Sequence, residues 1–372
     1  MTESAPSNAS DARYDLLNQW LTVSLKLELR SLAPASSDAS FRRYFRAELD
    51  GRTYIAMDAP PPLEDVRPFL RVAELMSKAG VKVPGVHAAD VARGFLLLED
   101  FGSEPYLDRL HTQSADALYG DALDALFTMQ SKIPPAASGL PEYHDGLLQR
   151  EFELFRDWFL QRLLGIELSS EEQALLDDCC ARLIANALEQ PTVVVHRDYH
   201  SRNLMVTENG NPGVLDFQDA VTGPITYDAV SLLRDCYVDW PLARVETWAL
   251  NYAARLRDAK LLDGEVEDEQ FLRWFDLMGM QRHLKAIGIF SRLKLRDGKS
   301  GYLQDIPRTL NYVLQSAGRY DIFAPFVALL EQHVVPRLDE VAGGANECHD
   351  PGRRPRRTAA AADRPHPQAP AA

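Results

Sequence analysis

The chain contains 372 residues, 46% of them hydrophobic and 25% charged, which is typical of one large globular unit or of two lobes with a sizeable core. Its formal net charge of -14 argues against general binding to nucleic acid or to an anionic membrane, because both would repel it at long range. The polar, acidic N-terminus does not resemble a signal peptide, and no run approaches the roughly 18 apolar residues of a membrane span. The four cysteines show no disulfide or zinc spacing, so we expect a soluble, cytoplasmic protein with reduced thiols.

Two segments near the N-terminus predict a helix followed by a hairpin. The segment "YDLLNQWLTVSL" has apolar residues at helical spacing, with Ser10 or Asp11 available as its N-cap. The segments "FRRYFRAEL" and "RTYIAMDA" have the composition of strands and flank Asp50-Gly51. Because this dipeptide favours the positive backbone angles of a tight turn, we expect the two strands to pair as a hairpin.

The remainder of the first hundred residues predicts one more helix and two more strands. The segment "LEDVRPFLRVAELMSKAG" has the helical period and ends at Gly80, a residue that favours the end of a helix. The segments "GVHAAD" and "GFLLLED" follow as a strand pair. We therefore expect residues 1–100 to form a small antiparallel sheet with one inserted helix.

From about residue 105 the pattern becomes helical, as in "DALYGDALDALFTMQSKI" and "SEEQALLDDCCARLIANAL". One insert rich in strands interrupts it, "PTVVVHRDYHSRNLMVTENGNPGVLDFQDA", with a turn at Asn209-Gly210. We expect residues 101–342 to form a mostly helical second lobe. Residues 343–372, rich in Ala, Pro and Arg, are predicted to be a disordered tail.

The insert carries a polar pattern suited to phosphoryl transfer. His196, Asp198 and Asn203 stand in the order H-x-D-x-x-x-x-N, and Asp216 follows Asn203 by thirteen residues at the end of a strand. Attack on the γ-phosphate of ATP needs an oriented hydroxyl and oxygen ligands for Mg²⁺. Asp198 suits the first role, and Asn203 and Asp216 suit the second because the intervening hairpin would bring them together. We expect His196 to order this loop through a backbone contact.

The segments "VVHRDYHSRN", "VLDFQDAVTGP" and "YDAVSLLRD" resemble the aminoglycoside-phosphotransferase and choline-kinase family over about residues 25–335. This resemblance implies an α+β, bilobal, protein-kinase-like fold, with a nucleotide-covering N-lobe and a helical C-lobe that holds the catalytic loop and the acceptor site. It further implies that Asp198 is the catalytic base, that Asn203 and Asp216 bind Mg²⁺, and that Asp228 is a buried brace of the catalytic loop. Segments such as "FRRYFR", "LLLEDFG" and "QRHLKAIGIFSRL" are most similar to bacterial N-acetylmuramate/N-acetylglucosamine anomeric kinases of cell-wall recycling.

The tripeptide Asp100-Phe101-Gly102 matches the metal-binding signature of protein kinases but stands in the wrong place. In kinase order the metal aspartate follows the catalytic loop, whereas Asp100 precedes Asp198 by ninety-eight residues. The segment "GFLLLEDFG" instead occupies the place of the last N-lobe strand and the hinge. We therefore expect adenine to contact backbone groups near Glu99 and Phe101.

Two parts of the kinase pattern are missing from the N-lobe. The segment "YIAMDAP" places Met57 where the strand lysine that pairs with ATP phosphates is usual, and no glycine-rich loop precedes it. Arg42 and Arg43 are available to contact phosphate, and strand alternation places them on opposite faces. Of the two, we expect Arg43 to contact the nucleotide; an exposed edge arginine is the alternative.

The acceptor is expected to contact the helices that follow Asp228. Residues 278–299 contain six Lys or Arg against one Asp in an acidic chain, which favours an acceptor with a carboxylate over a polycationic aminoglycoside. The alternative is a basic helix face balanced by acidic neighbours. Candidate acceptor contacts are Asp219, Arg234, Arg282 and His283.

Together these features predict an ATP-dependent, Mg²⁺-dependent kinase that phosphorylates the anomeric hydroxyl of N-acetylmuramate or N-acetylglucosamine. Its partners would be this amino sugar and ATP, without nucleic acid or membrane. Two alternatives remain open from the sequence. One is a kinase for another small acceptor, namely an amino alcohol, homoserine, a thiosugar or an aminoglycoside. The other is a non-catalytic, nucleotide-binding pseudokinase, which the absence of a lysine at position 57 would allow.

Overall fold

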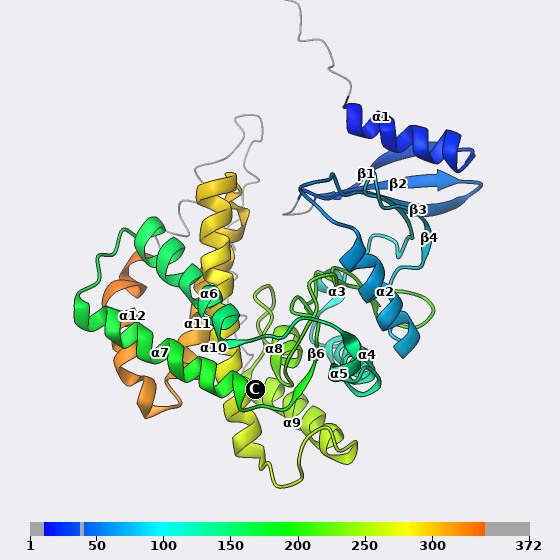
Figure 1. Cartoon of the computed structure of the whole chain (residues 1–372). Coiled ribbons are helices and arrows are strands. Elements are labelled where there is room, and N and C mark those ends of the chain that lie inside the picture. The colour runs from blue at the N-terminus through cyan, green and yellow to red at the C-terminus, as the bar shows by residue number, and fades with distance from the viewer. Residues whose placement is uncertain (1–10, 38–40, 339–372) are drawn as a thin grey trace, which may run out of the picture.

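The structure, a computed structural model, describes residues 11–37 and 41–338. A β-sheet with its flanking helices lies at one end of the molecule, and a mostly helical part lies at the other (Figure 1). The two-lobed α+β fold expected from the sequence is confirmed. The predicted tail, residues 343–372, and the alternative cap Ser10 lie outside the described residues.

The N-terminal part is built on one antiparallel sheet with the strand order β1-β2-β3-β5-β4. The strands are β1 (Ser31–Ser37), β2 (Arg43–Leu49), β3 (Arg52–Asp58), β4 (Val86–Asp90) and β5 (Phe95–Glu99). The predicted hairpin joins β2 to β3, and Asp50 and Gly51 adopt φ angles of 47° and 75°, as that turn requires. The sequence did not predict β1, whose Pro34 fits a strand at the sheet edge.

Different helices cover the two faces of this sheet. Helix α1 (Ala12–Gln19), capped by Asp11 as expected, continues as a π-helical turn (Trp20–Ser24) and packs on one face against Phe45 and Phe95. The opposite face carries Met57 and Leu96, which belong to the core that includes helix α2 (Arg67–Ala79). Since side chains alternate along a strand, neighbouring residues of β2 face different surroundings.

Helix α2 connects the sheet to the catalytic region. It ends as predicted at Gly80, which adopts the left-handed conformation with φ 90°. Its Phe69 ring lies 4.7 Å from the ring of Phe217, the residue after Asp216. The sheet, α2 and the segment around Asp216 therefore share one hydrophobic core.

The second part of the chain is mainly helical and is organised around one long helix. Helix α10 (Asp268–Asp297) packs against several other helices and is buried along much of its length. The remaining helices are α3 (Tyr106–Arg109), α4 (Ala115–Lys132), α5 (Pro135–Ser138), α6 (Asp145–Leu154) with its π-helical extension (Phe155–Leu163), α7 (Ser170–Leu188), α8 (Tyr227–Leu233), α9 (Leu242–Asp258), α11 (Ile306–Ala317) and α12 (Ala324–His333). Three 3₁₀ turns complete the description, Ser300–Asp305, Asp321–Phe323 and Val335–Arg337.

Two short pairs of antiparallel strands flank the predicted catalytic residues. Strand β6 (Thr192–Val195) pairs with β9 (Val221–Pro224), and β7 (Leu204–Met205) pairs with β8 (Gly213–Val214). Strand β9 was not predicted, because it contains Gly and Pro, which in a sequence indicate a turn. The loop between β6 and β7 carries His196, Asp198 and Asn203, and Asp216 follows β8.

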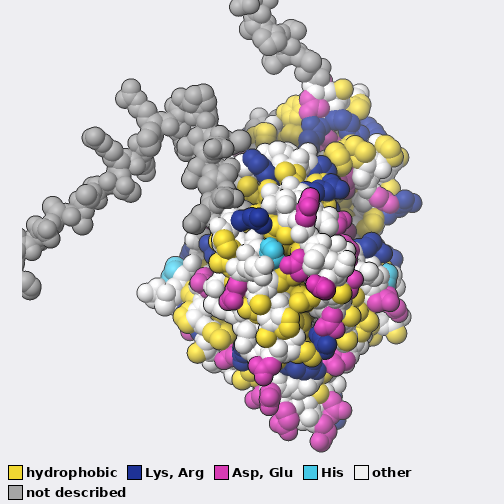
Figure 2. Space-filling model, turned by 90° about the vertical axis from the view of Figure 1, so that its left-hand side faces the viewer, with side chains coloured by type: hydrophobic (Ala, Val, Ile, Leu, Met, Phe, Trp, Pro, Cys, Tyr) yellow, Lys and Arg dark blue, Asp and Glu magenta, His cyan; other side chains and the backbone are white. Residues whose placement is uncertain are grey.

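The molecular surface does not carry its negative charge evenly. Acidic side chains gather at the lower end of the molecule in Figure 2, where α9 and α10 are joined in Figure 1. Lys and Arg side chains are more frequent on the upper part of that face. Among the described helices, none is long and apolar enough to cross a membrane.

Candidate active site

A buried carboxylate holds the start of the catalytic loop. Asp228, in the first turn of α8, accepts the backbone N–H of His196 at 2.6 Å and that of Arg197 at 3.0 Å. Burial raises the pKa of Asp228 to about 7, although both N–H groups favour its ionised form. The structure thus shows the brace that the sequence led us to expect.

The His196 ring links this loop to the end of β8. Its Nδ1 accepts the backbone N–H of Asp198 at 3.3 Å, so its Nε2 carries the hydrogen that is donated to the carbonyl oxygen of Leu215 at 2.9 Å. Burial lowers the pKa of His196 to about 4, so the ring is neutral near pH 7. His196 therefore has the expected structural contact, and it positions both Asp198 and the segment that leads to Asp216.

The loop also contains a strained residue. Arg197 adopts φ 80°, a value that side chains with a Cβ rarely take, and its N–H is held by Asp228. Such strain persists only where surrounding contacts enforce it, and it is concentrated at functional sites. The left-handed conformation of Arg197 changes the direction of the backbone immediately before Asp198.

Asp198 is set up as an ionised acceptor of a proton. Burial acts to raise the pKa of its carboxyl group, but nearby basic groups, first Lys285 and then His200 and Arg282, outweigh this effect and lower the pKa. A carboxylate that remains charged at neutral pH can orient a hydroxyl group and take its proton.

Asn203 and Asp216 lie side by side, as the hairpin predicted. Asn203 Nδ2 donates to the carbonyl oxygen of Asp198 at 3.0 Å and lies 3.4 Å from Asp216 Oδ2. Because the amide nitrogen is held in this way, Asn203 Oδ1 remains as the ligand atom of the side chain. A carboxylate and an amide oxygen form the donor set that Mg²⁺ prefers, completed in kinases by phosphate and water. These residues therefore fit the ion.

Further polar residues surround Asp216. Its backbone adopts φ 61°, a conformation that Asp tolerates better than most residues. Gln218 Nε2 donates to Asp216 Oδ1 at 2.7 Å and to Asp219 Oδ2 at 3.3 Å. The candidate acceptor residue Asp219, which is exposed, is thus linked through Gln218 to Asp216, the candidate metal ligand.

A buried charge cluster adjoins the catalytic loop, and sequence reasoning missed its centre. Glu151 of α6 lies 2.5 Å from Arg197 Nη2 and 3.0 Å from Lys285 Nζ, and it accepts a hydrogen bond from Tyr143. Lys285 also lies 3.3 Å from the hydroxyl of Tyr227. Only the six basic residues of 278–299 gave a signal for this cluster. Lys285 is balanced by Glu151, so part of that basic segment follows the alternative interpretation, in which acidic neighbours neutralise it.

Arg282, one turn from Lys285 on α10, keeps its place among the candidate acceptor residues. Its guanidinium lies over the Tyr227 ring, 5.1 Å from the ring centre, and near the carbonyl of Arg197 at 3.5 Å. It also contributes to the lowered pKa of Asp198. A cation is therefore located beside the predicted base.

The structure does not support the assignment of Arg234 and His283 as acceptor contacts. Arg234 is 3% exposed, forms an ion pair with Asp276 at 2.8 Å and donates to Ser316 at the junction of α10 and α11. His283 is fully buried, donates to the carbonyl oxygen of Arg234 at 2.8 Å and stacks on Tyr312. Arg234 directly follows α8, and His283 lies on the face of α10 that is turned towards the core.

The hinge segment explains the misleading Asp100-Phe101-Gly102 motif. Asp100 accepts Arg46 Nε at 2.6 Å and Arg46 Nη2 at 3.0 Å, and its side chain is 2% exposed. The Phe101 ring lies against Gly213, where an added Cβ would be only 2.4 Å from the ring. Glu99 ends β5, and its backbone N–H is bonded to Gly85. The hinge therefore lies beside the β8 strand that leads to Asp216.

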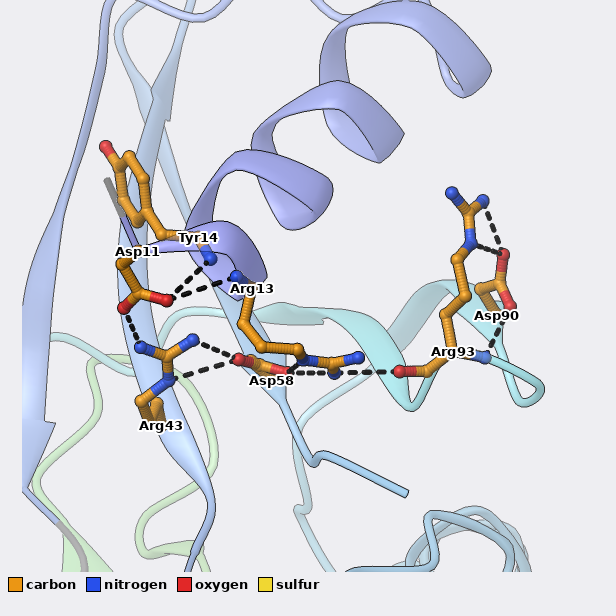
Figure 3. Close-up of polar contacts among 7 residues, drawn as sticks. All are labelled: Asp11, Arg13, Tyr14, Arg43, Asp58, Asp90 and Arg93. Carbon is orange, nitrogen blue, oxygen red and sulfur yellow. Dashed lines mark hydrogen bonds and ion pairs between the residues drawn. The ribbon is translucent and has the colours of Figure 1, made fainter. Parts of the chain in front are cut away.

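The structure separates Arg42 from Arg43. Arg43 pairs with the buried Asp58 and with Asp11 at the start of α1 (Figure 3), so it faces the helix and not the catalytic loop. Its predicted contact with the nucleotide is therefore not supported. Arg42 lies on the other face, with Nη2 3.5 Å from Asp216 Oδ1. The two arginines lie on opposite faces as predicted, and α1 covers the face that Arg43 occupies.

A sheet joined to a helical part, with Asp198, Asn203 and Asp216 gathered between β6 and β9, defines an ATP-dependent phosphotransferase of the protein-kinase-like fold. The model of the phosphotransferase enzyme family matches residues 31–275. The chain belongs to this family.

Individual proteins extend the comparison. The chain is 48% identical over 333 residues to a Pseudomonas aeruginosa protein named N-acetylmuramate/N-acetylglucosamine kinase, covering 87% of this chain and 97% of the relative. It is 42% identical over 323 residues to a Neisseria meningitidis protein of the same name, covering 86% and 95%. In fold it is similar to a choline kinase from Streptococcus pneumoniae, with a TM-score of 0.57, 12% identity and coverage of 82% and 100%. It also matches an aminoglycoside 2'-phosphotransferase, with a TM-score of 0.55, 14% identity and coverage of 83% and 100%.

Proposed function

We propose that this protein transfers the γ-phosphate of ATP to the anomeric hydroxyl of N-acetylmuramate or N-acetylglucosamine, in the cytoplasm and in the recycling of cell-wall sugars. The observation that carries the proposal is the 48% identity to a kinase with these named substrates over 97% of its length. The catalytic loop supports it, since Asp198, Asn203 and Asp216 lie together with the contacts that the chemistry needs.

Asp198 would bind the acceptor hydroxyl and take its proton as the bond to phosphorus forms. Its pKa is held low by Lys285 and Arg282, so the carboxylate is charged at neutral pH and a weak base. A weak base suffices, because an anomeric hydroxyl is more acidic than an ordinary alcohol. The main contribution of Asp198 is therefore orientation of the hydroxyl towards the phosphate.

Asn203 and Asp216 would hold Mg²⁺, Asn203 through Oδ1 and Asp216 through its carboxylate. The ion, when bound, supplies positive charge to the β- and γ-phosphates. The protein keeps both ligands in place through the hydrogen bond from Asn203 to the Asp198 carbonyl and that from Gln218 to Asp216. We propose that the adenine lies at the hinge, near the backbone of Glu99 and against the Phe101 ring that packs on Gly213.

Arg282 would bind the carboxylate of N-acetylmuramate. It lies beside Asp198 and Tyr227, while its neighbour Lys285 is already paired with Glu151. A guanidinium matches a carboxylate with two parallel hydrogen bonds. Asp219 would accept a sugar hydroxyl, since it is exposed and lies within one side chain of Asp216. A polycationic acceptor would be repelled by Arg282.

The test is to incubate the purified protein with Mg²⁺ and ATP and a panel of acceptors, and to identify products by phosphorus NMR. The panel should hold both amino sugars, choline, homoserine, a thiosugar and an aminoglycoside. We expect anomeric phosphates from the two amino sugars and none when Asp198 is changed to Asn. Phosphorylation of a different acceptor alone would contradict the proposed substrate, and absence of Mg-ATP binding would contradict the proposed reaction.

A further inference from the structure

The N-lobe has no cation where kinases place the strand lysine. Met57 occupies that position in β3, is 1% exposed and packs in the core with Leu96 and α2. Its side chain carries no charge. Transfer of a phosphoryl group from ATP nevertheless needs positive charge near the phosphates. Another residue of this chain has to supply it.

The three arginines in and directly before β2, Arg42, Arg43 and Arg46, have different partners. Arg43 faces α1 and pairs with Asp58 and Asp11. Arg46 forms a bidentate ion pair with Asp100 at the hinge. Arg42, directly before β2, lies on the same face of the sheet as Arg46 and extends towards Asp216. Its Nη2 lies 3.5 Å from Oδ1 of Asp216, the proposed metal ligand.

Two neighbouring carboxylates help to orient the side chain of Arg42. Glu64, in the segment before α2, accepts the backbone N–H of Phe41 at 3.2 Å and lies 4.0 Å from Arg42 Nε. The second carboxylate is Asp216. The Arg42 side chain is only 11% exposed, so it is packed into the site and does not extend into solvent. A guanidinium has five N–H donors in a planar fork, so one side chain can contact a carboxylate and phosphate oxygens together.

The neighbouring network prevents Arg42 and Arg43 from exchanging roles. Asp58 is fully buried and accepts Arg43 Nε at 3.1 Å on one oxygen and Arg13 Nε at 3.1 Å on the other. Arg13 also donates to the carbonyl oxygen of Arg93 at 2.8 Å (Figure 3). Because Arg43 is tied to α1 from this side, strand alternation directs Arg42 towards Asp216.

We propose that Arg42 is the residue that contacts the β- and γ-phosphates of ATP in this protein, in place of the missing strand lysine. Its charge is located at the metal aspartate, where the phosphates would meet the ion held by Asn203 and Asp216. In other kinases a lysine within β3 supplies the positive charge at the phosphates. Here the guanidinium of Arg42, directly before β2, would supply it. This inference rests on the proposed function, because it requires ATP as the ligand of the site.

The test compares the affinities of the protein for Mg-ATP, Mg-ADP and adenosine by calorimetry, without turnover. The variants are Arg42→Gln and Arg42→Lys, and the control is Arg52→Gln, an exposed arginine of the same sheet. We expect Arg42→Gln to weaken Mg-ATP binding by about 10- to 100-fold, as loss of a charged hydrogen bond does. Adenosine binding should stay unchanged, Arg42→Lys should retain part of the affinity, and the control should bind like the wild type.

Several outcomes would overturn the inference. Wild-type affinity for Mg-ATP in Arg42→Gln would show that another residue carries the charge. Equal losses for adenosine and Mg-ATP would show general damage to the site, which thermal unfolding of each variant would detect as well. Failure of the wild-type protein to bind any nucleotide would contradict the proposed function itself. Normal Mg-ATP binding by Arg42→Gln in an active kinase would contradict only the role of Arg42.

Discussion

Asp228 Oδ1 accepts the backbone N–H of Arg197 at 3.0 Å, and this contact helps to hold the strained turn that precedes Asp198, the proposed base. An amide at position 228 would turn a donor towards one of the two backbone N–H groups. We expect Asp228→Asn to cost about 1–3 kcal/mol in the geometry of the loop and to lower kcat by roughly 10- to 100-fold. The KM for ATP should change little, since the contacts of Asp228 are to the backbone of the catalytic loop and not to the hinge. Steady-state kinetics check both values, and an equal rise in KM would contradict a role confined to the loop.

The two aspartates of the sequence, Asp100 and Asp216, should respond differently to the same change. Asp216→Asn removes the charge of a proposed metal ligand, and we expect turnover to fall by roughly 100-fold or more. Asp100→Asn weakens contacts within the hinge, the pair with Arg46 and the bond from the Gly102 N–H, so ATP affinity should change by less than about tenfold, or 1.4 kcal/mol. Titration of activity against Mg²⁺ concentration separates them. A large rise in the Mg²⁺ requirement of Asp100→Asn would show that the chain order had been misread.

Arg282 should distinguish acceptors that differ by one carboxylate. We expect Arg282→Gln to raise the KM for N-acetylmuramate by about tenfold, the effect of about 1.4 kcal/mol, and to raise the KM for N-acetylglucosamine much less. The matched control is Arg296→Gln near the end of α10, where Arg296 is exposed and paired with Asp297. Parallel increases for both sugars would show that Arg282 supports the loop and does not bind the carboxylate.

Buried histidines should make the fold sensitive to acid. Burial lowers the pKa of His283 to about 3, from an ordinary value near 6.5, so the native state stays neutral where the unfolded chain takes up a proton. The contribution of neutral His283 to the free energy of unfolding is therefore fully present above pH 6.5 and is lost as the pH falls towards 3. Between pH 7.5 and 5 we expect His283 alone to account for about 2 kcal/mol.

The variant His283→Gln tests this origin of acid sensitivity. Its amide can donate to the Arg234 carbonyl as the ring does, but it does not titrate. Urea unfolding at several pH values should show a smaller loss of stability between pH 7.5 and 5 for the variant than for the wild type. Equal losses would mean that other groups, His196 among them, dominate.

The pairing of Asp58 with two arginines should contribute to stability. We expect Asp58→Asn to lower the free energy of unfolding by about 1–3 kcal/mol; this lies below the range for a fully buried pair because Arg13 and Arg43 are 30% and 35% exposed. Asp90→Asn, which breaks the more exposed pair with Arg93, should cost less than about 1 kcal/mol. Chemical denaturation measures both, and similar losses would show that burial of Asp58 does not matter.

The sequence by itself determined the order of the elements and the members of the catalytic loop. The turn at Asp50-Gly51 and the helix end at Gly80 depend on backbone preferences of neighbouring residues, so they were predictable. The spacing from Asp198 to Asn203, and the strand that leads to Asp216, likewise limit these residues to one site. The strand β9 and the edge strand β1 escaped prediction, because glycine and proline weaken the pattern of a strand.

Only the tertiary structure decided which of several equivalent side chains faces the site. Alternation separates Arg42 from Arg43, but the contact between Asp58 and Arg13, 45 residues apart in the chain, assigns Arg43 to the helix and Arg42 to Asp216. The pairing of Glu151 with Arg197 spans 46 residues in the same way. A local pattern describes the neighbours of a residue along the chain, whereas burial and charge pairing depend on distant segments that meet only when the core forms.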